Sequence, residues 1–169
     1  SDAIWAGMEQ AKADFGCDIR MIDIHPTDNS KYKAAVLEAA DSDAELIIGN
    51  AGSGLIDDLI AVAYDYPEKS FMCLDAPIDQ AEIPELPNFV GMMCKQNECS
   101  YLVGYLAGKM TEANKIGGIV GVEYPVLQDF LVGYISGAEQ ANPDIQVATA
   151  ATGDFVDTAK SKEIALAQY

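Results

Sequence analysis

The amino-acid sequence predicts an α/β fold built on parallel sheets. Short apolar runs that end in Gly, Asp or Pro alternate with amphipathic segments of helical length along the 169 residues, which is the pattern of repeated βα units. Half of the residues are hydrophobic by type. A chain of this length buries roughly 70% of the surface that its unfolded form exposes, so it needs no disulfide or metal to hold a core.

Hydrophobic spacing and turn residues predict the elements of the first part of the chain in order. Apolar residues recur at helical spacing from Ile4 to Phe15, and Gly16 supplies a stop. The stretch from Asp18 to Ile24 alternates apolar and polar residues as a strand does. Further along, the same reasoning predicts a helix at 28–40, a strand at 45–49, a helix at 55–66, strands at 70–74 and 88–93, and a helix at 96–110.

The character of the chain changes near Thr111 to Lys115, where a polar connector leads into an apolar strand at 116–122. We place a domain boundary there, with residues 1–113 forming a first Rossmann-like lobe and 114–169 the start of a second. The second lobe continues with a helix at 125–141, a strand at 145–150 and a helix from about 157. Two strands alone leave backbone edges unsatisfied, and a helix precedes any strand, so we expect the sequence to be part of a longer, two-lobed protein.

The charge of the chain argues against two classes of partner. Its net charge of -17 and pI near 4.1 repel phosphate backbones and anionic lipid, so we expect no nucleic-acid partner and no binding to a membrane surface. No apolar run reaches the ~20 residues that a bilayer span requires. The first residues carry neither a basic leader nor an apolar signal core, so we expect any targeting segment to precede Ser1.

The residue types used by metal sites and common enzymes are sparse. The four cysteines show no CxxC pair, and His25 is the only histidine, so we expect no structural zinc. Cys94 and Cys99 lie five residues apart, a spacing that points two helical side chains to different faces, which favours buried or free thiols. HExxH, GxSxG and P-loop motifs are absent, and we expect neither a cofactor nor an enzymatic activity.

A set of short segments in a fixed order carries a resemblance to a known family. These segments are Asp2–Met8, Glu45–Gly49, Phe71–Asp75 and Glu98–Gly108, then Pro125–Val126, Phe130, Gly133, Gly137, Asn142–Ile145, Gly153–Phe155 and Lys162–Tyr169. Over essentially its whole length the chain resembles the basic membrane protein family of ABC-transporter substrate-binding lipoproteins, related to the purine nucleoside receptor A type. The resemblance implies a type I periplasmic-binding-protein fold, in which two Rossmann-like lobes close on a ligand by hinge motion.

The resemblance also implies roles for particular residues. Phe130 matches an aromatic residue that stacks on the base in family members, and Asp75 matches an aspartate that bonds the ribose hydroxyls. Ser1 falls where the family has the asparagine of a Phe-Asn pair. The family further implies a monomer, lipid-anchored on the outer side of the cell membrane, with an ABC permease as its partner.

The residues themselves support a site with alternatives left open. Asp75 ends an apolar strand, and ligands of open α/β sheets bind outside the carboxyl ends of strands, where a carboxylate suits a vicinal diol. The alternative is a turn aspartate that faces water. Phe130 shares an apolar stripe with Val126 and Leu131, which by itself indicates packing in the core. The alternative, stacking of its ring on a purine, is what the resemblance implies.

Two turns are further candidates. Gly49 and Asn50 open a turn that leads to a helix N-terminus, where free N–H groups could meet a polar ligand, although an ordinary βα turn explains them equally well. The segment Gly153–Phe155 follows a strand end in the second lobe, and it could line the cleft with Gly153 as a contact, unless Asp154 there simply caps the next helix.

These observations favour a solute-binding protein that captures a nucleoside, most plainly a purine nucleoside, and hands it to a membrane permease. One alternative is an enzyme on a flavodoxin-like scaffold that cleaves or transfers the ribose of a nucleoside, with Asp75 acting on the sugar. Another is the ligand-sensing domain of a transcription regulator, which would require a basic DNA-binding headpiece.

Overall fold

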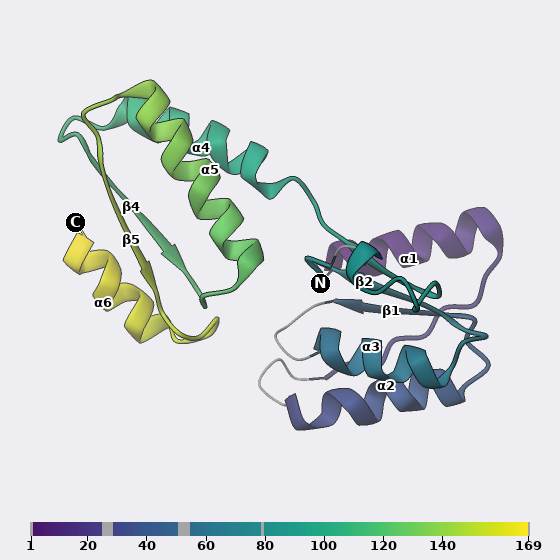
Figure 1. Ribbon diagram of the computed structural model, residues 1–169. Coiled ribbons are helices and arrows are strands. Elements are labelled where there is room, and N and C mark those ends of the chain that lie inside the picture. The colour runs from purple at the N-terminus through teal and green to yellow at the C-terminus, as the bar shows by residue number, and fades with distance from the viewer. Residues whose placement is uncertain (1, 25–28, 51–54, 79, 169) are drawn as a thin grey trace.

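The computed structural model describes residues 2–24, 29–50, 55–78 and 80–168, and these form two units joined by a short segment at 93–95 (Figure 1). The first unit contains a three-stranded sheet and the second a two-stranded sheet, and all strands are parallel to their neighbours. Within the described ranges, no helix is long and apolar enough to cross a membrane.

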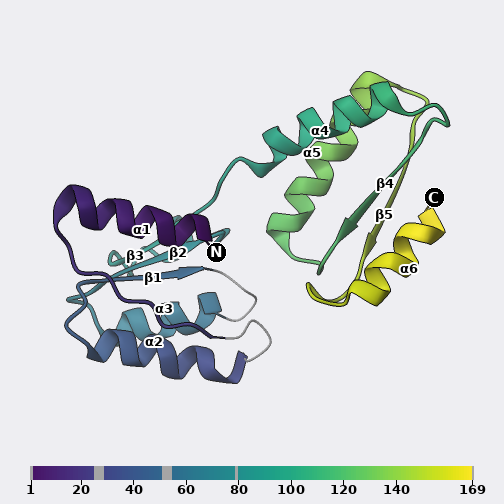
Figure 2. The ribbon, with the colours of Figure 1, turned by 180° about the vertical axis from the view of Figure 1, so that it is seen from behind.

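The first unit is a sheet with helices on both faces. Its strands lie in the order β1, β2, β3, with α1 on one face and α2 and α3 on the other (Figures 1 and 2). The elements are α1 (Asp2–Phe15), a 3-10 turn (Asn29–Lys31), α2 (Tyr32–Asp41), β1 (Leu46–Asn50), α3 (Leu55–Asp65), β2 (Ser70–Leu74), a second 3-10 turn (Gln80–Glu82) and β3 (Phe89–Met92).

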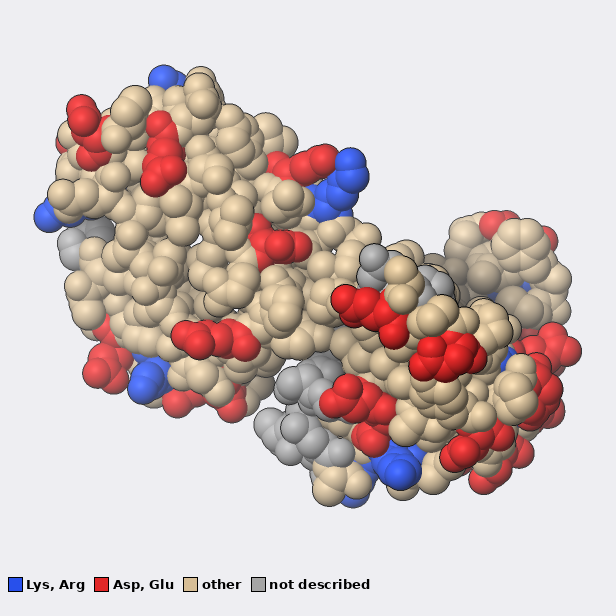
Figure 3. Space-filling view, in the orientation of Figure 1, with Lys and Arg blue, Asp and Glu red and all other residues tan. Residues whose placement is uncertain are grey.

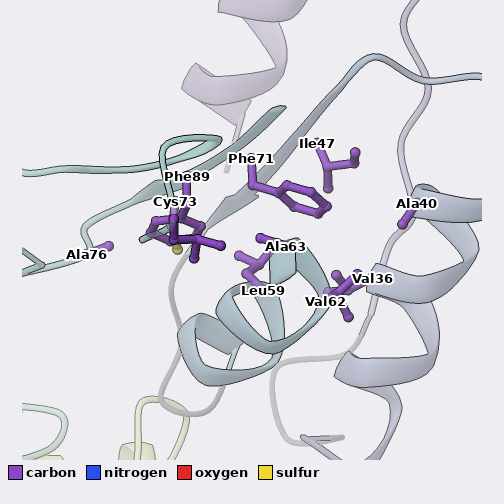
Figure 4. Close-up of a cluster of buried hydrophobic side chains, with 11 residues drawn as sticks. Val36, Ala40, Ile47, Leu59, Val62, Ala63, Phe71, Cys73, Ala76 and Phe89 are labelled. Carbon is purple, nitrogen blue, oxygen red and sulfur yellow. The ribbon is translucent and has the colours of Figure 1, made fainter. Parts of the chain in front are cut away.

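The core of this unit lies between the sheet and α2 and α3 (Figure 4). Phe71 of β2 and Phe89 of β3 are almost fully buried, and Leu59 and Val62 of α3 pack in the same cluster. The other members are Val36, Ala40, Ile47, Ala63, Cys73, Ala76 and Leu86. This core holds the carboxyl end of β2 in a fixed place.

The strand predicted at 18–24 is wrong, because these residues form no strand. Met21 and Ile22 are exposed, and no strand lies beside them in the sheet, where β1 pairs only with β2. Alternating hydrophobicity makes a segment suitable for a sheet, but a strand also needs a neighbouring backbone to complete its hydrogen bonds. The predicted helix that precedes it is present as α1, ended by Gly16 with a φ of 70° and an N–H donated to the Lys12 carbonyl at 2.9 Å.

The second unit is built on two helices in close contact. Its elements are α4 (Gln96–Met110), β4 (Lys115–Val120), α5 (Pro125–Ala141), β5 (Gln146–Ala151) and α6 (Thr158–Gln168). The helices α4 and α5 pack in parallel along their length, with Gly104 and Gly108 of α4 against the backbone of α5 and Gly133 and Gly137 of α5 against the backbone of α4.

The packing therefore changes between β3 and α4, earlier than the boundary predicted at 113/114. The sequence predicts that the helix at 96–110 belongs to the first lobe, because it precedes the polar connector. In the structure this helix packs against α5, and Gln96, which is buried, donates a hydrogen bond to Asp129 of α5 at 2.9 Å. The segment at 93–95 is thus the crossing between the two units.

Candidate functional site

The carboxyl ends of the first sheet place two predicted site residues at one edge. The parallel register pairs Asn50 with Leu74 and Leu74 with Met92, so the chain leaves all three strands at the same side. Asn50 is exposed as the last residue of β1, and Asp75 directly follows β2. Figures 1 and 2 show this edge turned toward the second unit.

Asp75 is held in an unusual backbone conformation. It is exposed and has a φ of 56°, in the left-handed region that non-glycine residues rarely adopt. The next residue, Ala76, is buried and donates its N–H to the Met92 carbonyl at 3.3 Å, which anchors the turn on β3. Strained residues of this kind concentrate at functional sites, and this one presents its carboxylate at the edge where ligands of α/β sheets bind.

Gly49 and Ser1 are the other predicted site residues of the first unit, and unlike Asn50 neither is seen exposed at the carboxyl edge. Gly49 is buried, and a Cβ added to it would lie 2.4 Å from Cδ1 of Leu59, so its small size lets α3 pack on β1. That contact is a packing role, whereas the ligand role predicted for Gly49 stays a prediction. Ser1, and residues 51–54 of the predicted glycine-rich turn, lie outside the described residues.

The carboxyl edge of the second sheet is formed by the turns after β4 and β5. Thr152 donates its N–H to the Val120 carbonyl and its hydroxyl to the Gly121 carbonyl, both at 2.9 Å. Gly153 is exposed with a φ of 84°, so the chain turns there in a conformation that suits glycine. The Asp154 carboxylate accepts the N–H groups of Val156 and Asp157 in the turn before α6. The helix itself is capped by Asp157, whose carboxylate accepts the N–H of Lys160 at 2.8 Å, so the capping role considered for Asp154 belongs to Asp157.

Phe155 is an aromatic residue at this edge and belongs to the segment Gly153–Phe155, which the sequence predicts as a candidate lining of the cleft. Its ring is 70% exposed yet lies against Gly121, where an added Cβ would be 2.4 Å from Cδ1 of Phe155. The ring thus rests with one part on the backbone after β4 and leaves the remainder accessible. The sequence places Phe155 shortly after the strand β5, but only the tertiary structure shows that its ring is exposed and lies on Gly121.

Phe130 lies in a different setting. It is 40% exposed on α5 and lines a groove of about 380 Å³ that follows β4. The groove is lined by Ser100, Gly117, Gly118, Ile119, Val120, Gly121, Leu127, Phe130, Leu131 and Tyr134. Phe130 is therefore not in a closed core, and its role in base stacking stays a prediction.

Tyr124, directly before α5, is a residue that no pattern in the sequence singles out for the site. It is half-buried and immediately precedes α5. Burial raises its pKa, and electrostatic interaction with Cys73, Asp57 and Asp75 raises the pKa further. Tyr124 belongs to the second unit and those three groups to the first, so its side chain lies within the electrostatic field of the first sheet's carboxyl edge.

The thiol of Cys73, which lies in β2 two residues before Asp75, is buried and is not a nucleophile at neutral pH. Its burial, together with the charge of Asp75, raises its pKa to about 12. Cys17, Cys94 and Cys99 are exposed, and all four cysteines are unpaired. Within the described part of the chain, no group of three or more His, Cys, Asp or Glu residues is arranged to hold a metal ion.

The acidic residues gather mainly over the first unit. In the view of Figure 3, Asp and Glu side chains cover much more of the first unit than of the second. The sequence agrees, since residues 1–92, which make up the first unit, hold 18 acids and 5 bases, a net charge of -13. A negatively charged solute would therefore be repelled as it approached the edge that carries Asp75.

Comparisons with known proteins extend over the whole chain. Residues 1–169 match the model of the Bmp family, described as PnrA-like ABC transporter substrate-binding proteins. The chain is 34% identical over 138 residues to a CD4+ T-cell-stimulating antigen of Listeria monocytogenes, covering 82% of this chain and 37% of that protein. It is 34% identical over 140 residues to the ABC transporter nucleoside-binding protein BmpA of Lactococcus lactis, covering 83% of this chain and 38% of that protein.

Solved structures give the same fold. An ABC transporter solute-binding protein from Aeropyrum pernix aligns with a TM-score of 0.80 at 24% identity, covering 97% of this chain and 46% of that one. A solute-binding protein from Conexibacter woesei aligns with a TM-score of 0.66 at 25% identity, covering 98% of this chain and 54% of that one. The chain thus spans less than two fifths of the length of the Listeria and Lactococcus proteins.

The parallel sheets, the structural alignments and the family match agree with the fold expected from the sequence, the type I periplasmic-binding-protein fold. The chain belongs to the Bmp family of PnrA-like ABC transporter substrate-binding proteins.

Proposed function

We propose that the protein captures a nucleoside, with purine nucleosides as the first candidates, and delivers it to an ABC permease. The observation that carries this proposal is the position of Asp75, an exposed carboxylate with a φ of 56° at the carboxyl edge of the first sheet. A carboxylate accepts two hydrogen bonds in a plane, which suits the neighbouring hydroxyl groups of a ribose. The Lactococcus relative is named as a nucleoside-binding protein, which supports the same choice of ligand.

A nucleoside base binds well when it can stack on an aromatic side chain, and the second unit has two candidates for this role. Phe155 is 70% exposed at the carboxyl edge of the second sheet, where its ring lies on Gly121. Phe130, the residue implied by the family resemblance, is 40% exposed in the groove beside β4. Stacking of a base on either ring would contribute ~1 to 3 kcal/mol. Its exposure and its place at the edge favour Phe155.

The charge of the protein selects against phosphorylated ligands. A nucleotide would bring two or more negative charges to an edge that carries Asp57 and Asp75, on a chain with a net charge of -17. A neutral nucleoside is not repelled in this way. We therefore propose nucleosides rather than nucleotides.

The location and partners follow from the family. A substrate-binding protein of an ABC transporter acts outside the cytoplasm, and we propose a monomer held at the membrane by a lipid anchor, beside its permease. We propose a binding role without catalysis, with no metal and no cofactor. If the protein instead cleaved the ligand, free ribose or the free base would accumulate during incubation.

Thermal unfolding of the intact protein tests the proposal. The scan is made with and without inosine, guanosine, adenosine, cytidine and free ribose, and each ligand is recovered afterwards and checked for cleavage. A ligand at 100 times its dissociation constant adds ~2.7 kcal/mol to the free energy of unfolding, which shifts the midpoint by several degrees. A shift with intact purine nucleosides supports the proposal. The absence of a shift with every nucleoside overturns it, and release of ribose favours the enzyme alternative.

A further inference from the structure

The turn that carries Asp75 lies directly on β3. Ala76 donates its N–H to the Met92 carbonyl at 3.3 Å, which continues the pairing of β2 with β3 beyond the end of β2. Two residues later, Ile78 donates its N–H to the Ala76 carbonyl at 2.8 Å, so Pro77 stands at the centre of a tight three-residue turn. Ala76 is buried in the core cluster (Figure 4), and Ile78 packs against that cluster. The backbone directly after Asp75 is therefore fixed to β3 and to the core.

Gly91 of β3 makes this arrangement possible. It pairs in register with Cys73 of β2, and the turn after β2 passes over it. A Cβ added to Gly91 would lie 2.9 Å from the Ala76 carbonyl oxygen, 3.3 Å from Cβ of Ile78 and 3.4 Å from the Ile78 carbonyl oxygen. Two of these atoms belong to the backbone of the turn, so a methyl group could be accommodated only if the turn moved away from β3. Asp75 directly precedes Ala76, and a displaced turn would carry the Asp75 carboxylate with it.

We infer that Gly91 is a positioning residue for ligand binding, because the absence of a side chain there sets the place of the Asp75 carboxylate. The φ of 56° at Asp75 is a conformation whose cost the surrounding contacts must offset. The contacts of Ala76 and Ile78 do so only while the turn lies on Gly91. A carboxylate that is held in advance binds a diol with a smaller loss of conformational entropy than a mobile one. This inference rests on the proposed function, in which Asp75 accepts the ribose hydroxyls, and adds that β3 sets how strongly those hydroxyls are bound.

The test asks whether a methyl group at position 91 weakens recognition of the ribose hydroxyls. Binding of inosine and of 2′,3′-dideoxyinosine to the intact protein is measured by titration calorimetry, for the wild type and for Gly91→Ala. We expect inosine to bind about tenfold more weakly to the variant, because its hydroxyls lose a well-placed carboxylate. The affinity for dideoxyinosine should stay within about twofold, because this ligand lacks the hydroxyls that Asp75 would accept.

The matched control is Gly108→Ala in α4. A Cβ at Gly108 would lie 2.8 Å from the Ala138 carbonyl oxygen of α5, close to the 2.9 Å found at Gly91, but within the second unit. Urea unfolding should show a loss of stability in both variants, while only Gly91→Ala loses affinity for inosine. If Gly91→Ala does not fold, Pro77→Ala takes its place, because it loosens the same turn without adding bulk to the core. It should weaken inosine about threefold and leave dideoxyinosine unchanged.

Three results would overturn the inference and leave the nucleoside assignment intact. The first is an unchanged affinity for inosine in the folded variant of the turn. The second is an equal loss for both ligands, because the change would then act on a part of the site other than the sugar contact. The third is an equal loss of inosine affinity in Gly108→Ala, which would show a general effect of lost packing. If the wild-type protein binds neither inosine nor any other purine nucleoside, the proposed function itself fails and the inference fails with it.

Discussion

Gly104 lies so close to Tyr134 that a Cβ added to the glycine would be 1.9 Å from the Tyr134 carbonyl oxygen. The reciprocal contact lies one turn along, where a Cβ at Gly137 would be 2.0 Å from the Tyr101 carbonyl oxygen. Two pairs of glycines, each four residues apart, thus bring the backbones of α4 and α5 into contact. The Ser100 hydroxyl adds a hydrogen bond to the Phe130 carbonyl at 2.6 Å. This packing explains why α4 belongs to the second unit.

We expect Gly104→Ala to destabilise the protein by about 3 kcal/mol, because the added methyl group meets backbone rather than a movable side chain. Chemical denaturation of the intact protein measures the change. The matched control is Gly7→Ala in α1, where nothing lies within 4 Å of the added Cβ, and which should be neutral or stabilising. Equal stability of the two variants would contradict the close helix contact.

Asn88 directly precedes β3 and stabilises the first unit at the amino end of its sheet. Its side-chain amide donates to the carbonyls of Ala63, Tyr66 and Lys69, at 3.0, 3.1 and 3.1 Å, and so ties the end of α3 to β3. We expect Asn88→Ala to lower the free energy of unfolding by about 2 kcal/mol, since it removes all three of these hydrogen bonds from a part-buried position.

The control for this change is Gln10→Ala. Gln10 donates an exposed hydrogen bond to Asp14 within α1, at 2.8 Å, and its loss should cost less than about 0.5 kcal/mol. If Asn88→Ala proves as mild as the control, the Asn88 amide does not hold the connection between α3 and β3.

Because of Cys73, we expect the first unit to become less stable as the pH rises into the alkaline range. Burial raises the pKa of its thiol from an ordinary value of 9.0 to about 12 in the folded protein. Below pH 9 the thiol is protonated in both states, and its contribution to stability is fully present. Above that pH the unfolded chain loses the proton first, so the free energy of unfolding should fall as the pH rises from 9 toward 12.

Urea unfolding at several pH values from 7 to about 10 measures this loss of stability, and the loss should be smaller in Cys73→Ala.

The four thiols should also differ in reactivity. Iodoacetamide at pH 8 should modify the exposed Cys17, Cys94 and Cys99 but reach Cys73 only after unfolding. Rapid modification of Cys73 in the folded protein would show that its environment is open.

Asp75→Gly separates binding from stability. Glycine adopts a φ of 56° without strain, so the free energy of unfolding should change by no more than about 1 kcal/mol. The shift in unfolding temperature caused by a purine nucleoside should nevertheless disappear. Asn114→Gly is the control, because Asn114 has a φ of 53° after α4, outside the proposed site, and this variant should keep the shift. A nucleoside shift retained in Asp75→Gly would remove Asp75 from the site.

Phe155→Ala should weaken purine nucleoside binding by about tenfold or more if its ring stacks on the base. The control is Phe15→Ala, which removes a ring that is 83% exposed at the end of α1 and should leave binding unchanged. Phe130→Ala, measured in the same titration, decides between the two aromatic candidates. A loss in Phe130→Ala alone would favour the residue implied by the family resemblance over the one favoured by exposure.

The sequence by itself determined the helices of the second unit with the correct bounds. The predicted helices at 96–110 and 125–141 coincide with α4 and α5, and the strand at 70–74 coincides with β2. Apolar periodicity and turn residues act over a few neighbouring positions, so they can be read without knowing the rest of the fold. The position of Asp75 at a strand end followed from the same local pattern.

Only the tertiary structure decided which of these elements meet. It left residues 18–24 without a strand partner, packed α4 on α5 instead of on the first sheet, and brought Tyr124 into the field of Asp75. Sheet pairing, glycine contacts between helices and the approach of two units all join residues that are distant along the chain. Their free energy depends on which backbones come close in space, and no local pattern in the sequence carries that information.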